Sequence, residues 1–73
     1  MDESVYKVIE LIGTSSESWE AAAKAAVERA AESLEDVRVA EVVKLDMRLD
    51  NNKVTQFRAR VMVSFKYHKH LTD

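Results

Sequence analysis

One segment of the chain, residues 19–34, repeats its apolar residues at helical spacing, and most of them are alanine. The apolar side consists of Trp19, Ala23, Ala26, Val27, Ala30 and Leu34, and charged residues occupy the opposite stripe. Because alanine side chains are short, such a helix can lie close to a sheet but fills little volume. The segment therefore predicts a single helix that covers one face of a β-sheet. Thr14, Ser15, Ser16 and Ser18 all offer hydroxyl groups that could cap its start.

The segments on either side of this helix have the patterns of strands. Residues 5–12, VYKVIELI, are rich in β-branched and aromatic residues and end at Gly13, which can adopt backbone angles that other residues avoid. After residue 34 the apolar period changes to two. The predicted second strand has Val37, Val39, Val43, Leu45, Met47 and Leu49 on one face, and the third has Phe57, Ala59, Val61, Val63, Phe65 and Tyr67.

The loop between the last two strands determines which residues pair. Their apolar faces coincide only if the loop has an odd number of residues, because paired residues of a hairpin point to the same side. We therefore expect a three-residue loop from Asn51 to Lys53 rather than a two-residue turn. This register places Asp46 opposite Arg58, so that the two side chains can form an ion pair.

The order of elements predicts an α+β fold, βαββ, with a three-stranded antiparallel sheet packed on one helix. A strand that leads through a helix to another strand normally leaves the two parallel, so the third strand fits between them in order 1-3-2. The second sheet face then has no cover, and on it we expect Val42, Val54 and Met62 among Arg58, Arg60, Ser64 and Lys66. Such a mixed surface favours association with other copies of the chain.

Length and composition support the same conclusion. The chain has 73 residues, enough for one domain over 1–73, and no cysteine, so disulfides cannot supplement its small core. No segment has the length or apolar character of a membrane span or signal peptide, which favours the cytoplasm. The net charge of −2, with both signs interspersed, argues against a nucleic-acid or membrane partner.

Several strings resemble the dodecin family: VYKVIELIGTS, SWEAA at the helix start, VRVAEVV, and VSFK late in the third strand. The resemblance spans nearly the whole chain and implies a hollow homododecamer that binds or stores a small ligand and is not an enzyme. It also implies flavin, FMN or riboflavin, held between subunits by a stacking tryptophan and a hydrogen-bonding glutamine. Alignment with the family puts Val39 at the tryptophan position and Arg58 at the glutamine position. Stacking on an aromatic ring contributes about 1–3 kcal/mol per base in comparable contacts, so we expect flavin binding to be weakened or lost.

Several other residues could bind a ligand, but each also has an ordinary structural role. Asp46, Asp50 and Asn51, with Asn52, carry the hard oxygen atoms that calcium prefers, although aspartate and asparagine are also common turn residues. Arg58 and Arg60 could bind phosphate or carboxylate, whereas Arg58 could equally pair with Asp46. His68 and His70 could bind a transition metal, although their position is typical of a terminal tail.

No set of residues has the pattern of a catalytic site. Three interpretations therefore remain open from the sequence: a shell that stores a small molecule, a shell that binds a divalent cation such as calcium, and a purely structural assembly.

Overall fold

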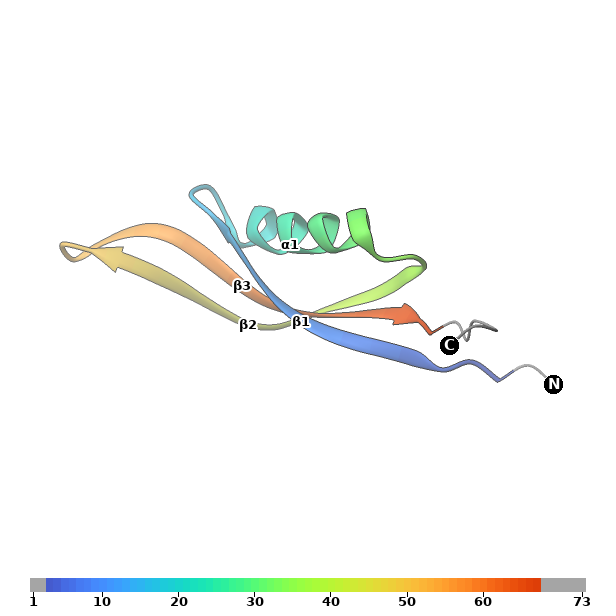
Figure 1. Ribbon diagram of the computed structural model, residues 1–73. Coiled ribbons are helices and arrows are strands. Elements are labelled where there is room, and N and C mark those ends of the chain that lie inside the picture. Colours follow the sequence, from blue (N-terminus) through green and yellow to red (C-terminus); the bar gives the residue numbers. More distant parts are fainter. Residues whose placement is uncertain (1–2, 68–73) are drawn as a thin grey trace.

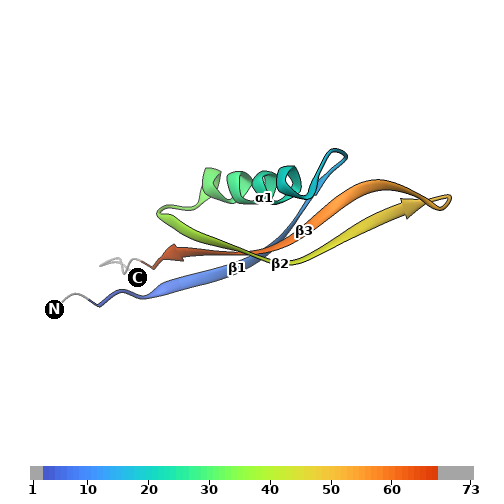
Figure 2. The same cartoon turned by 180° about the vertical axis from the view of Figure 1, so that it is seen from behind.

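The computed structural model describes residues 3–67 and contains one helix and three strands. The elements are β1 (Tyr6–Ser15), α1 (Trp19–Ser33), β2 (Val37–Asp50) and β3 (Lys53–Lys66). The sheet has the order β1-β3-β2, and both neighbouring pairs are antiparallel. Two opposite views show α1 on one side of the sheet and, among the described elements, none on the other side (Figures 1 and 2). The predicted βαββ fold with strand order 1-3-2 is confirmed.

Ser18 is the residue that caps the start of α1, out of the four candidate hydroxyl residues. Ser18 has extended backbone angles, and its hydroxyl accepts a hydrogen bond of 3.0 Å from the Ala21 N–H. This contact satisfies one of the N–H groups that the first turn of a helix leaves without a partner. At the other end the Leu34 N–H donates to the Ala30 carbonyl at 3.0 Å. Within residues 3–67, no helix is long and apolar enough to cross a membrane.

Gly13 is required for a different reason from the one that the sequence indicated. β1 continues through it to Ser15, and the φ angle of Gly13 is not positive. Gly13 is buried where β1 passes beneath the helix, and an added Cβ would lie 2.0 Å from the carbonyl oxygen of Ala22. A glycine in a strand commonly marks such a close backbone approach. The missing side chain therefore allows the strand and helix to approach.

The β2–β3 turn differs from the predicted loop of three residues. Asp50 pairs with Lys53 across Asn51 and Asn52, which have positive φ values of 52° and 63°. Two central residues with positive φ are the feature of the type I′ hairpin turn, which asparagine tolerates well. The prediction of a three-residue loop is wrong, because the odd residue that aligns the two apolar faces lies within β3 and not in the turn.

A bulge at Thr55 absorbs that residue. Leu49 pairs with Val54 but Arg48 pairs with Gln56, so Thr55 has no partner in the register. Its hydroxyl lies within hydrogen-bond distance of the Arg48 carbonyl oxygen, at 3.3 Å, and of the Asp50 carboxylate, at 3.2 Å. From Arg48 to Lys44 the register is the one expected, and the predicted pairing of Asp46 with Arg58 is confirmed.

Two further register shifts, at Arg38 and Val43 of β2, change which residues face the helix side. Val42 pairs with the buried Val61, whereas Val39 pairs with Ser64 on the uncovered face. The prediction that Val39 shares a face with the other odd-numbered apolar residues of this strand is wrong. The placement of Val42 and Val54 on the uncovered face is also wrong, because Val54 pairs with Leu49 on the helix side. Each extra residue moves the side chains that follow it to the opposite face of the sheet. A prediction that assumes strict alternation along the strand cannot include such a shift.

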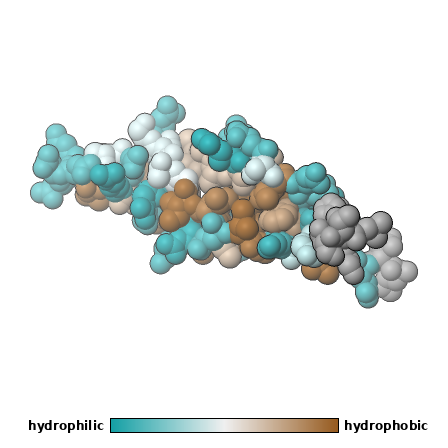
Figure 3. All heavy atoms as spheres, in the orientation of Figure 1, coloured by the Kyte–Doolittle hydropathy of each residue, from teal (hydrophilic) through white to brown (hydrophobic). Residues whose placement is uncertain are grey.

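The hydrophobic core of the single chain is small. Its buried members are Ala22, Ala26, Ala30, Ala59, Val61 and Val63, and the largest fully buried side chains are valines. Exposed large apolar residues include Val8, Ile12, Val39, Val42, Val43, Leu45, Met47 and Leu49, and Figure 3 shows apolar atoms exposed on one side of the chain. The helix lies over β1 and β3 and hardly contacts β2.

The shape of the chain is unusual for its size. The radius of gyration is 15.3 Å and the extents are 55 × 21 × 16 Å, whereas a compact domain of this length should have a radius of about 11 Å. The β2–β3 hairpin extends well beyond the end of the helix (Figure 1). An extended hairpin with exposed apolar residues has the surface of a subunit that packs against other copies of itself.

Candidate ligand site on the uncovered sheet face

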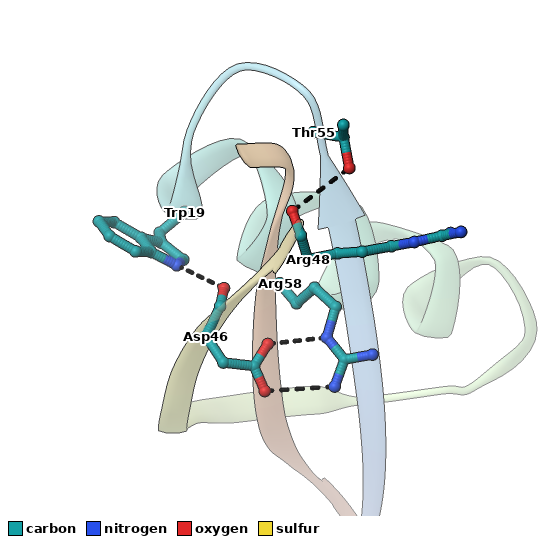
Figure 4. Close-up of polar contacts among 5 residues, drawn as sticks. All are labelled: Trp19, Asp46, Arg48, Thr55 and Arg58. Atoms are coloured by element: carbon teal, nitrogen blue, oxygen red, sulfur yellow. Dashed lines mark hydrogen bonds and ion pairs between the residues drawn. The ribbon is translucent and has the colours of Figure 1, made fainter. Parts of the chain in front are cut away.

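Asp46 and Arg58 form a two-pronged ion pair across the hairpin. Arg58 Nε donates to Asp46 Oδ1 at 2.7 Å and Nη2 donates to Oδ2 at 3.2 Å (Figure 4). The two residues are direct partners in the β2–β3 register, so the backbone sets both ends of the contact. Such parallel hydrogen bonds orient a guanidinium more strictly than a single contact does. The pair that the sequence predicted is therefore present, and it occupies both oxygens of the carboxylate.

This ion pair changes the titration of both partners. The hydrogen bond from Arg58 holds the pKa of Asp46 below its ordinary value of 3.8, against an opposing effect of desolvation. The positive charges of Arg58, Arg60 and Lys44 lower the pKa further. In turn, the hydrogen bond to Asp46 raises the pKa of Arg58. Asp46 is therefore a permanent anion near neutral pH, with three cations around it.

Trp19 holds the start of α1 against β2 on the helix side of the sheet. Its indole Nε1 donates to the backbone carbonyl of Asp46 at 3.0 Å (Figure 4). The ring meets Phe57 edge to face, with centroids 5.1 Å apart and planes at 70°. Since Phe57 alternates with Arg58 along β3, the tryptophan lies on the helix side of the sheet. Trp19 is an anchor in this chain, as its place in the apolar stripe predicted, and its ring does not lie on the uncovered face.

The two residues at the family's flavin positions do not meet within one chain. Val39 is 61% exposed and pairs with Ser64, six residues along β3 from Arg58. At about 3.3 Å per residue the separation along the strand is roughly 20 Å. Both residues nevertheless lie on the uncovered face, because Ser64 and Arg58 are on the same side of β3. A flat ligand could contact both only between two copies of the chain.

The candidate cation ligands are also dispersed along the hairpin. Asp46 and Asp50 are four residues apart on β2, about 13 Å by strand geometry. The Asp50 carboxylate lies 3.2 Å from the Thr55 hydroxyl and 3.8 Å from Arg48 Nε, and Asn51 lies in the turn. Within residues 3–67 no three acidic or histidine side chains are close enough to hold a metal ion. His68 and His70 lie outside the described residues.

The pattern of the sequence did not single out Lys44. In the structure it pairs directly with Arg60, and both residues lie beside the Asp46–Arg58 pair. Arg60 Nε is 4.0 Å from Glu10 Oε2 on β1. The register that pairs Asp46 with Arg58 also pairs Lys44 with Arg60, two residues further along the hairpin, but nothing in the sequence marked Lys44 as a ligand group.

One helix over a three-stranded sheet in the order 1-3-2, with the other sheet face uncovered, is the fold of the dodecins. The family model for dodecin matches residues 5–68, which is nearly the whole chain. The chain belongs to the dodecin family, as the resemblance of its local strings predicted.

The chain is similar to a curated dodecin and to solved dodecin structures from two organisms. The calcium dodecin of Mycobacterium tuberculosis (strain ATCC 25618 / H37Rv) is 52% identical over 63 residues, covering 86% of this chain and 89% of the relative. A crystal structure described as the calcium dodecin of that organism, with a novel calcium-binding site, has 51% identity and a TM-score of 0.80, covering 89% of this chain and 93% of the other. A Thermus thermophilus dodecin variant has 33% identity and a TM-score of 0.84, covering 92% and 100%.

Proposed function

We propose that this protein is a cytosolic, non-enzymatic protein that holds a small ligand or ion in a hollow homododecamer. Three features of the single chain support assembly: its small core of alanine and valine, its extended hairpin and its exposed apolar residues. A chain with so little buried volume is marginally stable alone and gains stability by packing against copies of itself. Membership in the dodecin family supports twelve as the number of subunits.

Flavin is poorly suited to be the ligand. Val39 offers no ring on which FMN or riboflavin could stack, and Asp46 engages two of the guanidinium nitrogens of Arg58. A flavin that used Arg58 would have to compete with a two-pronged contact whose shorter distance is 2.7 Å. We therefore expect binding at least about tenfold weaker than in a relative with the stacking tryptophan, since ~1.4 kcal/mol already gives that factor.

Calcium is the better candidate, and the observation that carries it is the 52% identity to a calcium dodecin. The oxygen-bearing residues Asp50 and Asn51 lie together at the end of the hairpin. Asp46 is the less suitable ligand of the predicted three, because Arg58 already occupies its carboxylate. One chain supplies only part of a coordination shell, so a complete site would need oxygen atoms from neighbouring copies.

Calorimetric titration of the chelator-treated assembly with calcium chloride tests this proposal. We expect saturable binding that Asp50→Asn weakens by about tenfold or more, which corresponds to ~1.4 kcal/mol. Glu28→Gln removes an equal charge from the exposed side of the helix and should leave the affinity unchanged. Absence of saturable binding would contradict calcium as the ligand, and absence of both calcium and flavin binding would favour the purely structural assembly.

A further inference from the structure

Two cationic side chains face each other on the uncovered side of the sheet. Arg60 lies between the buried residues Ala59 and Val61 of β3, so its side chain points away from the helix. Lys44 is its direct partner on β2 and therefore lies on the same face. Like charges placed directly opposite each other in an antiparallel pair destabilise it. The arrangement needs a compensating negative charge.

The register of β2 places Lys44 beside Asp46 on the uncovered face. The two residues alternate regularly along the strand, because Lys44 pairs with Arg60 and Asp46 with Arg58. The regular stretch ends at a bulge, where the extra residue Val43 shifts the register and leaves Val42 on the helix side. The two cations therefore lie next to a bulge, which is a feature common beside functional sites.

Acidic side chains near the two cations offset their charge only in part. The Asp46 carboxylate is engaged at both oxygens by Arg58. Glu10 approaches Arg60 only to 4.0 Å, and within residues 3–67 no ion pair joins an acidic side chain to Lys44. Glu41 also lies on this face, because it pairs with Met62. By register the face carries an excess of positive charge, although the whole chain has a net charge of −2: its charged residues are Glu10, Glu41 and Asp46 against Lys44, Arg48, Arg58, Arg60 and Lys66.

We propose that Lys44 and Arg60 form a binding site for a small, multiply charged oxyanion of the phosphate class. A tetrahedral oxyanion can accept hydrogen bonds from an ammonium group and a guanidinium at once, which suits the two donor types present. Binding would remove the repulsion across the β2–β3 pair, so the anion should stabilise the hairpin. The site is separate from Asp50 and Asn51 and does not depend on calcium binding.

Titration of the assembled protein with inorganic phosphate tests the site, in calcium-free buffer so that calcium phosphate cannot form. Calorimetry gives the affinity, and thermal unfolding in phosphate or in sodium chloride of equal ionic strength separates binding from screening. Lys44→Gln is the main variant because its side chain is exposed and makes no ion pair within the described chain. Lys24→Gln, on the exposed face of α1, removes the same charge away from the site.

We expect saturable binding to the parent protein and an affinity at least about tenfold lower for Lys44→Gln, or ~1.4 kcal/mol. Lys24→Gln should bind phosphate like the parent. Phosphate should also raise the unfolding temperature of the parent more than sodium chloride does, and this difference should vanish in Lys44→Gln. Equal effects of the two salts on the parent, or an equal loss of affinity in both variants, would overturn the proposal. Neither result would affect the proposed calcium site.

Discussion

Replacing Gly13 with alanine should destabilise the subunit more than its size suggests. An added Cβ would lie 2.0 Å from the Ala22 carbonyl oxygen, 2.9 Å from the Ala22 carbonyl carbon and 3.0 Å from the Ala26 Cβ. The nearest atoms belong to the helix backbone and cannot rotate away. Since ordinary contact begins at 3.4 Å, the helix would have to retreat from β1 by about 1.4 Å, and the alanine-rich interface would open.

The cost of this change can be bounded from the geometry. Overpacking a well-packed core typically costs about 1–3 kcal/mol, and the backbone clash places Gly13→Ala at the upper end. Replacing a glycine within a strand by alanine also stabilises the folded chain by roughly 0.5–1 kcal/mol, because the unfolded chain loses conformational freedom. The net destabilisation is then about 2 kcal/mol.

Denaturant unfolding followed by circular dichroism, at one fixed chain concentration, measures this difference. Thr14→Ala is the matched control, because Thr14 is the next residue and is exposed on the uncovered face. It should change the unfolding free energy by less than about 1 kcal/mol. Adding Ala26→Gly to Gly13→Ala should restore little stability, since it removes only the 3.0 Å contact. Full restoration, or equal effects of Gly13→Ala and Thr14→Ala, would refute the explanation by backbone clash.

Three further predictions concern the hairpin. Because the pKa of Asp46 is lowered in the folded chain, its stabilising contribution should be complete above about pH 4 and lost as the pH falls through the lowered value; unfolding measured at pH 5 and pH 3 should show a smaller acid loss for Asp46→Asn than for the parent. Asn52→Gly should preserve or raise the unfolding temperature and Asn52→Val should lower it, because φ is 63° there. Val39→Trp with Arg58→Gln should raise flavin affinity in fluorescence titration more than either change alone, since both act on one ring; an assembled double variant that binds no better than the parent would show that these are not the ligand positions.

The main features of the fold follow from hydrophobic periodicity. The change from helical spacing to alternation after residue 34 predicted α1 and the two long strands, and the crossover rule predicted the strand order. The Asp46–Arg58 contact was also predictable, because matching the apolar faces of two strands fixes which residues pair. The predicted register was right between Lys44 and Arg48, although the predicted loop was one residue too long.

The bulges could not be predicted in the same way. An extra residue at Thr55, Val43 or Arg38 leaves the composition of a strand unchanged and only inverts its alternation from that point. The predictions therefore misplaced Val39, Val42 and Val54. The role of Gly13 was hidden for a related reason, because close approach to the helix is a property of the packed chain.

Native mass spectrometry of the full-length protein under mild conditions tests the central claim most directly. A shell of twelve chains of 8.3 kDa has a mass of about 100 kDa, and any bound ion or ligand adds to that mass in the same spectrum. We predict this species at micromolar chain concentration, with little or no folded monomer. A stable 8.3 kDa species with the secondary structure of the folded chain would contradict the account.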